Sequence, residues 1–226
     1  RDGDRFMVET EGRDGRPAAF AVSHSFGLEP LQQYLVTFPD GRLQALPWAW
    51  DTRPREAGGQ RWFHVYGDDP VPSSDSRHWT RYLQTWNHMC AECHSTALDK
   101  GYDAASNTYR TTWSEISVGC EACHGGGKGH VAWARAGAKP GGSLKGFATA
   151  AVVRGPVDWS QDPVTGSPRA GTARPAGGEL ETCGRCHSRR GQVWPAWQPG
   201  RPLADTHRPA LLTPDLFEDD GQMKDE

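Results

Sequence analysis

Three short stretches of the chain repeat the same arrangement of two cysteines and a histidine. They are residues 90–94, 120–124 and 183–187; each reads Cys-x-x-Cys-His, and together they use all six cysteines of the 226 residues. In a helix or tight turn, positions i, i+3 and i+4 lie on one side of the backbone, so two thiols and an imidazole can meet one planar group. This is the attachment sequence of c-type haem, in which the thiols form thioethers with the porphyrin and the imidazole binds the iron. The sequence therefore predicts three covalent c-type haems.

Nine residues are predicted to attach these haems, and the histidine of each motif is predicted to bind iron. They are Cys90, Cys93, His94, Cys120, Cys123, His124, Cys183, Cys186 and His187. The main alternative is zinc, but zinc ribbons need no histidine after every pair, and three pairs leave one pair unmatched. A thiol redox motif follows a strand in a βαβ pattern, which this sequence does not show, and a disulfide framework would rarely place every cysteine three positions from another.

Each iron still needs a ligand on its second face, and the chain offers six histidines outside the motifs. We expect two-histidine ligation, with candidate metal ligands His130, His207, His78 and His64, whereas His24 and His88 are disfavoured. The link from His124 to His130 is too short to wrap around its own porphyrin, so His130 should bind a neighbouring iron. For each candidate, the alternative is a hydrogen-bonded surface or core histidine.

Methionine is the other common axial ligand, and it would raise the reduction potential. Only Met7, Met89 and Met223 are present, and Met89 directly precedes Cys90, so it cannot reach the far face of its own haem. Methionine ligation is not excluded, but few methionines are available for it.

The composition suggests that haem replaces a conventional core. Hydrophobic residues make up 36% of the chain, which also holds 27 glycines, 17 prolines and ten tryptophans. A haem that buries several hundred Å² of apolar surface contributes on the order of 10 kcal/mol at about 25 cal/mol per Å². We therefore expect the tryptophans to pack around the porphyrins, and we expect the haem-free protein not to fold.

Charge and hydropathy limit the partners and the location. The formal net charge is −3, and nothing in the pattern suggests nucleic-acid binding. No run of about 18 apolar residues is present, so no transmembrane span is predicted. Residues 1–4 do not open a signal peptide, whereas covalent haem attachment takes place outside the cytoplasm. We expect an extracytoplasmic protein, in the periplasm or at the cell exterior, and a chain that is a processed or partial product.

The fold class predicted is a multihaem cytochrome c: a haem-cored, largely irregular α+β protein with short helices at each motif and a small N-terminal antiparallel β meander. Residues 1–67 are expected to form a β subdomain that walls the haems, and residues 68–226 the three-haem domain with an extended C-terminal tail. Alternating residues predict strands at 5–10 and 19–26, and further strands are expected at 33–38 and 43–50, on either side of a turn at 39–41, and at 61–66.

Helices are expected nearer the motifs. The predicted segments are 77–89, a helix that starts at the capping box of residues 112–115 and carries Cys120, 130–136, and 178–190. The glycines of residues 125–129 should break the helix of the second motif, and residues 157–172 contain a possible hairpin. Residues 191–226 contain five prolines and suggest an extended tail.

Several stretches resemble the multihaem cytochrome c proteins that often continue into tetratricopeptide repeats. They are residues 86–96 (Trp-Asn-His-Met-Cys-Ala-Glu-Cys-His-Ser-Thr), 109–116 and 181–187, with further similarity at 30–36 and 51–54. Residues 120–130 are more distantly similar to the tetrahaem electron carriers of ammonia oxidisers, in which a histidine after the glycine loop binds another haem; this implies the same role for His130.

The chain departs from that family in two respects. Residues 125–127 are three glycines where Gly-Pro-Gly is usual, and further haem sites usually precede and follow this region. The resemblance thus implies a piece of a larger protein or a trimmed member, in which another chain could supply a distal ligand.

Electron transfer between redox partner proteins is the function that these features predict, because three haems in so short a chain must lie close together. An extended form is a conduit that stacks with copies of itself, or with further haem domains of a longer chain, into a wire. The alternative is a multihaem oxidoreductase, with one open iron, that acts on a small nitrogen or sulfur oxyanion. Nothing in the sequence demands an open iron, because spare imidazoles outnumber irons, so a carrier is favoured over an enzyme.

Overall fold

A computed structural model describes residues 1–139, 144–147, 158–171 and 178–224 of the chain. The chain divides into two compact units, residues 1–119 and 120–226. The boundary drawn from the sequence after residue 67 falls inside unit 1, which therefore contains both the β region and the first Cys-x-x-Cys-His motif. None of the described helices has the length and apolar character needed to cross a bilayer.

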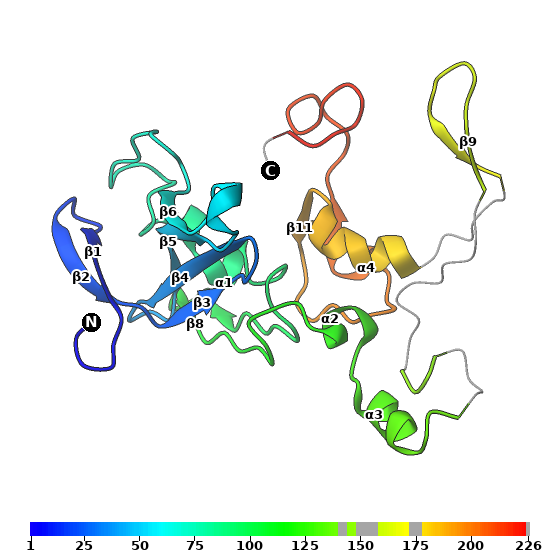
Figure 1. The fold of residues 1–226 in the computed structure, drawn as a ribbon, viewed down its shortest axis with the longest axis horizontal. Coiled ribbons are helices and arrows are strands. Elements are labelled where there is room, and N and C mark those ends of the chain that lie inside the picture. The colour runs from blue at the N-terminus through cyan, green and yellow to red at the C-terminus, as the bar shows by residue number, and fades with distance from the viewer. Residues whose placement is uncertain (140–143, 148–157, 172–177, 225–226) are drawn as a thin grey trace. The chain divides into compact units, whose positions relative to one another are not determined.

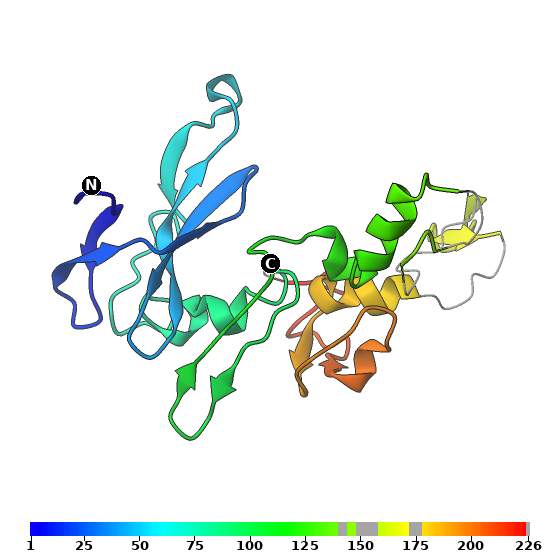
Figure 2. The ribbon, with the colours of Figure 1, turned by 90° about the horizontal axis from the view of Figure 1, so that it is seen from below.

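Unit 1 is built on antiparallel strands, as the alternating residues predicted (Figures 1 and 2). A hairpin pairs β1 (Met7–Glu11) with β2 (Pro17–Ala21), and a four-stranded sheet has the order β3 (His24–Phe26), β4 (Leu31–Thr37), β5 (Leu43–Asp51) and β6 (Arg61–His64). The single strand expected at 19–26 is in fact two, because β2 pairs with β1 whereas β3 pairs with β4. A smaller pair joins β7 (Tyr102–Asp103) to β8 (Thr108–Tyr109).

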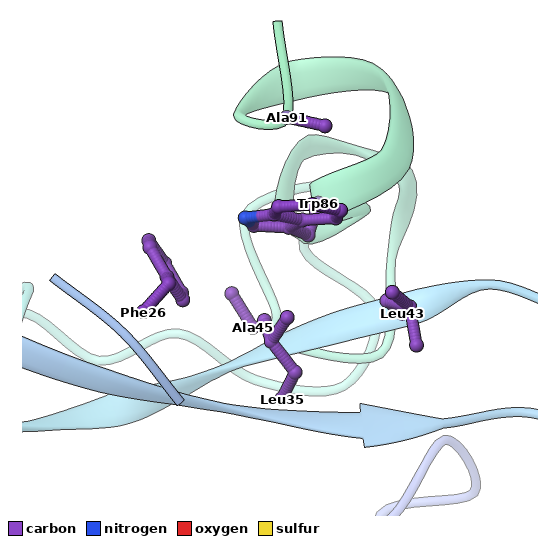
Figure 3. Close-up of a cluster of buried hydrophobic side chains, with 6 residues drawn as sticks. All are labelled: Phe26, Leu35, Leu43, Ala45, Trp86 and Ala91. Atoms are coloured by element: carbon purple, nitrogen blue, oxygen red, sulfur yellow. The ribbon is translucent and has the colours of Figure 1, made fainter. Parts of the chain in front are cut away.

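The four-stranded sheet buries apolar side chains on both faces. Consecutive residues of a strand point to opposite faces, and on β4 both Leu35 and Val36 are buried. Leu35 belongs to a cluster with Phe26, Leu43, Ala45, Trp86 and Ala91, whereas Val36 packs with Leu46 and Trp79. Figure 3 shows Trp86, on the short helix α1 (Trp86–Met89), lying between Ala91 and the side chains of the sheet. The apolar core of unit 1 thus extends directly to the first motif.

A helix over residues 77–89 was predicted, and this prediction is wrong. Only the 3₁₀ turn η2 (Tyr82–Gln84) and α1 are helical in this stretch. The side-chain amide of Gln44, on β5, donates to the carbonyl oxygens of Trp79 at 2.7 Å and Arg81 at 2.9 Å. The Trp79 carbonyl therefore bonds to the sheet, whereas the Arg81 carbonyl also accepts from the Gln84 amide at 3.1 Å in the 3₁₀ turn.

The helix predicted to start at residues 112–115 is also wrong. Thr112 and Glu115 instead form isolated β bridges with Asp99 and Thr96, and α2 (Cys120–His124) begins only at the first cysteine of the second motif. The Thr96 hydroxyl donates to the Ser117 carbonyl oxygen at 2.8 Å and accepts from the Gly119 amide at 2.8 Å. Long-range bridges thus replace the local capping bonds in this stretch.

In the part of unit 2 that the structure describes, the chain forms short helices and two small strand pairs. Besides α2, its elements are α3 (Lys128–Arg135), β9 (Trp159–Gln161), β10 (Pro168–Ala170), α4 (Gly178–His187), β11 (Arg190–Gln192), η3 (Leu203–Asp205) and β12 (His207–Pro209). Gly125, with φ of 72°, follows α2 and separates it from α3, which confirms the predicted break. The hairpin expected within residues 157–172 is β9–β10, whereas the tail includes a paired strand and is not simply extended.

Among its described residues, unit 2 buries very little apolar material. Ala122 and Leu203 are its buried apolar residues. Ala122 has a small side chain, and Leu203 belongs to neither buried apolar cluster. Its exposed apolar side chains are Val131, Trp159, Val164, Leu180, Val193, Trp194, Leu211 and Leu212. A unit with this distribution has little hydrophobic stabilisation of its own, because that stabilisation scales with the apolar area removed from water.

Asn87 should be a key stabilising residue of unit 1. Its side chain is fully buried; the oxygen accepts from the Leu43 amide at 2.6 Å, and the nitrogen donates to the Gly41 carbonyl at 3.2 Å and the Thr111 hydroxyl at 2.8 Å. We expect Asn87→Ala to lower the free energy of unfolding of unit 1 by about 2–4 kcal/mol, because it leaves buried polar groups unpaired. Denaturant titration measures this loss. Met89→Ala, at an exposed position of the same helix, is the control and should cost less than about 1 kcal/mol.

The two units should respond differently to loss of haem. Hydrogen exchange of protein produced without haem attachment should show protected amides in β4 and β5 but fast exchange throughout α4, because the buried apolar clusters of the described residues lie in unit 1. Equal protection of α4 and β5 in the haem-free protein would contradict this expectation. Protection in β5 but not in α4 would mean that, without haem, unit 1 still folds and only unit 2 does not.

Candidate haem-attachment sites

The first motif follows α1 and lies in turns, not in a helix. Cys90 has right-handed helical dihedrals, and the His94 amide donates to the Cys90 carbonyl at 3.0 Å, so one turn separates the two residues. The His94 ring lies edge-on to Phe26, with ring centroids 5.6 Å apart. The motif is therefore mounted against the buried cluster of the sheet.

Burial sets the protonation of this first site. It raises the pKa of the Cys90 thiol to about 11, with a smaller contribution from Cys93, and it lowers the pKa of His94 below its ordinary value. A neutral imidazole is the form that binds a metal, and a buried thiol that stays neutral resembles the uncharged thioether of an attached haem. The surroundings of both side chains thus fit the predicted roles.

In the second motif, α2 carries Cys120, Cys123 and His124 on little more than one turn. The ring centroid of His124 lies 5.1 Å from that of Phe147. Phe147 in turn stacks on His130, with centroids 4.4 Å apart and planes at 16°. One aromatic ring therefore contacts both the motif histidine and the histidine that the sequence favoured as an axial ligand.

His130 has the hydrogen bond that a metal-binding imidazole commonly makes. Its Nδ1 lies 2.8 Å from the carbonyl oxygen of Lys145, which can only accept, so Nδ1 carries the proton and donates. The Nε2 lone pair is then the one directed to a metal, and such a carbonyl bond fixes the tautomer and ring orientation. Trp133, with its ring 5.4 Å away, packs on the same imidazole.

The third motif lies at the end of α4, where Cys183, Cys186 and His187 are exposed. His187 lines a cavity of about 570 Å³. The other residues that line it are Ser188, Arg189, Pro209, Ala210, Leu212, Phe217, Gly221, Gln222 and Met223. This volume lies within the range of roughly 300–1,000 Å³ that is typical of sites for organic ligands.

Three further axial ligands were predicted from the sequence, namely His64, His78 and His207. His64 and His78 line one pocket of about 130 Å³, which is too small to hold a haem. His78 is buried with Nδ1 2.9 Å from the Thr80 hydroxyl, and His207 is buried with Nδ1 2.8 Å from the Thr206 hydroxyl. Across the described residues, no group of three or more His, Cys, Asp or Glu side chains is arranged to hold a bare metal ion. Their ligation remains a prediction.

His24, which the sequence disfavoured, lies closer to the first site than expected. Its ring is 5.5 Å from that of Trp113, which packs on the same cluster as Cys90 and Trp86. Burial lowers the pKa of His24, so its imidazole is mainly neutral at pH 7. The alternation of β3 could have shown this, because His24 and Phe26 are two residues apart and share a face.

Three observations of the chain itself fit covalently attached haem. None of the six cysteines forms a disulfide. The exposed apolar side chains of unit 2 offer the contacts that a porphyrin requires. The Nε1 of Trp86 is buried without a hydrogen-bond partner in the structure, and such buried donors are normally paired. When bound, c-type haem supplies an iron that takes up and releases one electron.

The thiols should differ in reactivity before haem attachment, because the thiolate is the nucleophile. At a pKa of about 11, Cys90 holds on the order of a hundredth of the thiolate of an ordinary thiol at pH 8. We expect iodoacetamide to alkylate Cys90 in haem-free protein at least tenfold more slowly than the exposed Cys183, as measured by peptide mass mapping. The Cys90 rate should keep rising towards pH 11; equal rates at the two cysteines would refute the burial of the first site.

The comparisons with known proteins agree with the motif. Residues 72–125 match the family model described as cytochrome c554 and c-prime. No curated protein matches the chain. Among solved structures, it resembles the outer cell wall cytochrome OcwA, with 18% identity and a TM-score of 0.45 over 86% of this chain and 35% of that one. It also resembles an undecaheme cytochrome from the S-layer of Carboxydothermus ferrireducens, with 26% identity and a TM-score of 0.31 over 49% of this chain and 14% of that one.

The chain thus spans about a third of the first of these cytochromes and about a seventh of the second. The family match covers the first motif and the second, and the third repeats their spacing in full. In residues 72–125 and in its three motifs, the chain is thus similar to multihaem cytochromes c.

Proposed function

We propose that this chain transfers electrons outside the cytoplasm through three covalently attached c-type haems, most of them with two histidine ligands. The observation that carries the proposal is that every cysteine belongs to a Cys-x-x-Cys-His motif and none forms a disulfide. A chain that used its cysteines for stability would pair them, and a zinc protein would not need the histidine after each pair.

The shortage of apolar core in unit 2 supports the same conclusion. Two of the three motifs lie in this unit, whose described residues bury only Ala122 and Leu203 among apolar side chains. Two porphyrins would cover the exposed apolar side chains with a contribution on the order of 10 kcal/mol each. Haem in this proposal is both the redox group and the core.

The axial ligands on the motif side are His94, His124 and His187. On the second face, His130 is the best supported, because its Nδ1–H bond to the Lys145 carbonyl and its stacking on Phe147 hold the ring in one orientation. His207, His78 and His64 remain candidates; His207 and His78 are the two of these that are buried.

An iron with ligands on both faces exchanges electrons without binding a substrate, which is the property of a carrier. The protein then has to hold the imidazoles at fixed orientations and keep water from the haem faces, which the aromatic contacts of His94, His124 and His130 would do. The partners are redox proteins outside the cytoplasm, further haem domains, or copies of this chain stacked into a wire.

The proposal is tested by the mass and spectrum of the purified holoprotein. We expect the polypeptide mass plus three haems, and Cys→Ala replacement of both cysteines of any one motif should remove one haem and leave the other two. An intact mass with no covalent addition would refute the proposal. The spectrum should be that of low-spin haem, whereas a high-spin fraction at one iron would instead support the oxidoreductase that acts on a small oxyanion.

A further inference from the structure

The cavity beside the third motif brings together the motif histidine and one methionine. His187 and Met223 both line it, although 35 residues separate them in the sequence. The thioether sulfur of methionine is one of the axial ligands that haem iron accepts opposite histidine. We infer that Met223 is the second axial ligand of the third haem, an assignment that rests on the proposed function of the chain.

The C-terminal segment is folded so that Met223 is held in place. Met223 forms an antiparallel bridge with Phe217, the Glu218 amide donates to the Gln222 carbonyl at 2.7 Å, and the Lys224 amide donates to the Leu216 carbonyl at 3.0 Å. Residues that bridge in this way present their side chains on the same side of a hairpin. Both Phe217 and Met223 accordingly line the cavity.

This hairpin is tied to the residues that follow the motif. The Arg189 guanidinium, two residues after His187, donates to the Lys224 carbonyl oxygen. The Arg189 carbonyl oxygen accepts from the Ala210 amide at 2.7 Å, which extends the β11–β12 pair. Arg189 thus joins the residues that follow His187 to the hairpin that contains Met223.

The rest of the lining suits a porphyrin face. Pro209, Ala210, Leu212 and Phe217 are apolar, and Leu212 is 75% exposed, so it gains from being covered. Each apolar side chain covered by the haem contributes in proportion to its area. A neutral thioether adds no charge to such a site and has no proton to lose.

His207 is the competing ligand, and the structure engages it elsewhere. Among the described residues that line the cavity, His207 is absent. It is only 3% exposed, and its backbone pairs with Gln192 across β11 and β12. To bind an iron in this cavity, the buried His207 ring would have to move, whereas Met223 already lines the cavity.

The consequence is a difference in reduction potential. Methionine opposite histidine raises the potential of haem iron above that of two-histidine ligation. The third haem would then be the most easily reduced of the three, and electrons that enter the other two would collect there.

The test uses the holoprotein and three methionine variants. Met223→Leu conserves volume, whereas Met7→Leu and Met89→Leu are matched controls at the other two methionines. Oxidised wild-type protein should show the sulfur-to-iron charge-transfer band in the far red, and Met223→Leu alone should lose it. In a redox titration, the highest of the three potentials should fall in Met223→Leu and stay unchanged in the controls. His207→Gln should keep the band.

Haem mass separates failure of this inference from failure of the proposed function. Fewer than three haems in the wild-type protein would refute the proposed function and this inference with it. Three haems without the band in the wild-type protein, or a band that survives in Met223→Leu, would overturn the Met223 assignment alone. Loss of low-spin character at one iron in His207→Gln, with no change in Met223→Leu, would assign the ligand to His207.

Discussion

Apolar surface must be covered, and the two units of this chain meet that constraint in different ways. In unit 1, Leu35 and Val36 of one strand are buried on opposite faces of a sheet, so polypeptide covers polypeptide. In unit 2, Leu180, Trp194 and Leu211 remain exposed. Burial of apolar surface stabilises a protein by about 25 cal/mol per Å². The exposed apolar side chains of unit 2 do not contribute this stabilisation. Under the proposed function, the order of unit 2 would depend on its haems, whereas unit 1 can hold its motif with protein contacts.

The sequence predicted the strands of unit 1 well because their signal is local. The apolar runs of β4 and β5 lie on either side of the turn at residues 39–41, and this pattern is visible without knowledge of the partners. The helices at 77–89 and 112–115 failed for the opposite reason. Gln44 and Thr96 supply hydrogen bonds from distant parts of the chain, and these replace the local bonds that a helix would have made. Tertiary contacts of this kind cannot be seen in a short window of sequence.

The residues of the candidate sites likewise include some that local sequence identifies and others that depend on the fold. The motif residues can be identified from the sequence because the chemistry of attachment fixes their spacing within five positions. The ligand on the second face comes from anywhere in the chain, so its identity depends on the fold. The Lys145 carbonyl that orients His130 lies 15 residues beyond it, and Met223 reaches the cavity of His187 only through the C-terminal hairpin. Counting spare histidines favoured His207 but could not show that it was already buried and bonded.

The two units differ in how well the polypeptide supports their motif residues. Asn87 joins α1 to the backbone of Leu43 and Gly41, so the helix that precedes Cys90 is fixed to the sheet by buried hydrogen bonds. The orientation of His94 is then largely set by the polypeptide before haem is attached, and ligands locked by a rigid second shell move little when the charge of the iron changes. The exposed Cys183, Cys186 and His187 have no comparable support from an apolar core. Under the proposed function, the porphyrin would order these ligands, and the residues of the C-terminal hairpin that line the same cavity would belong to the site.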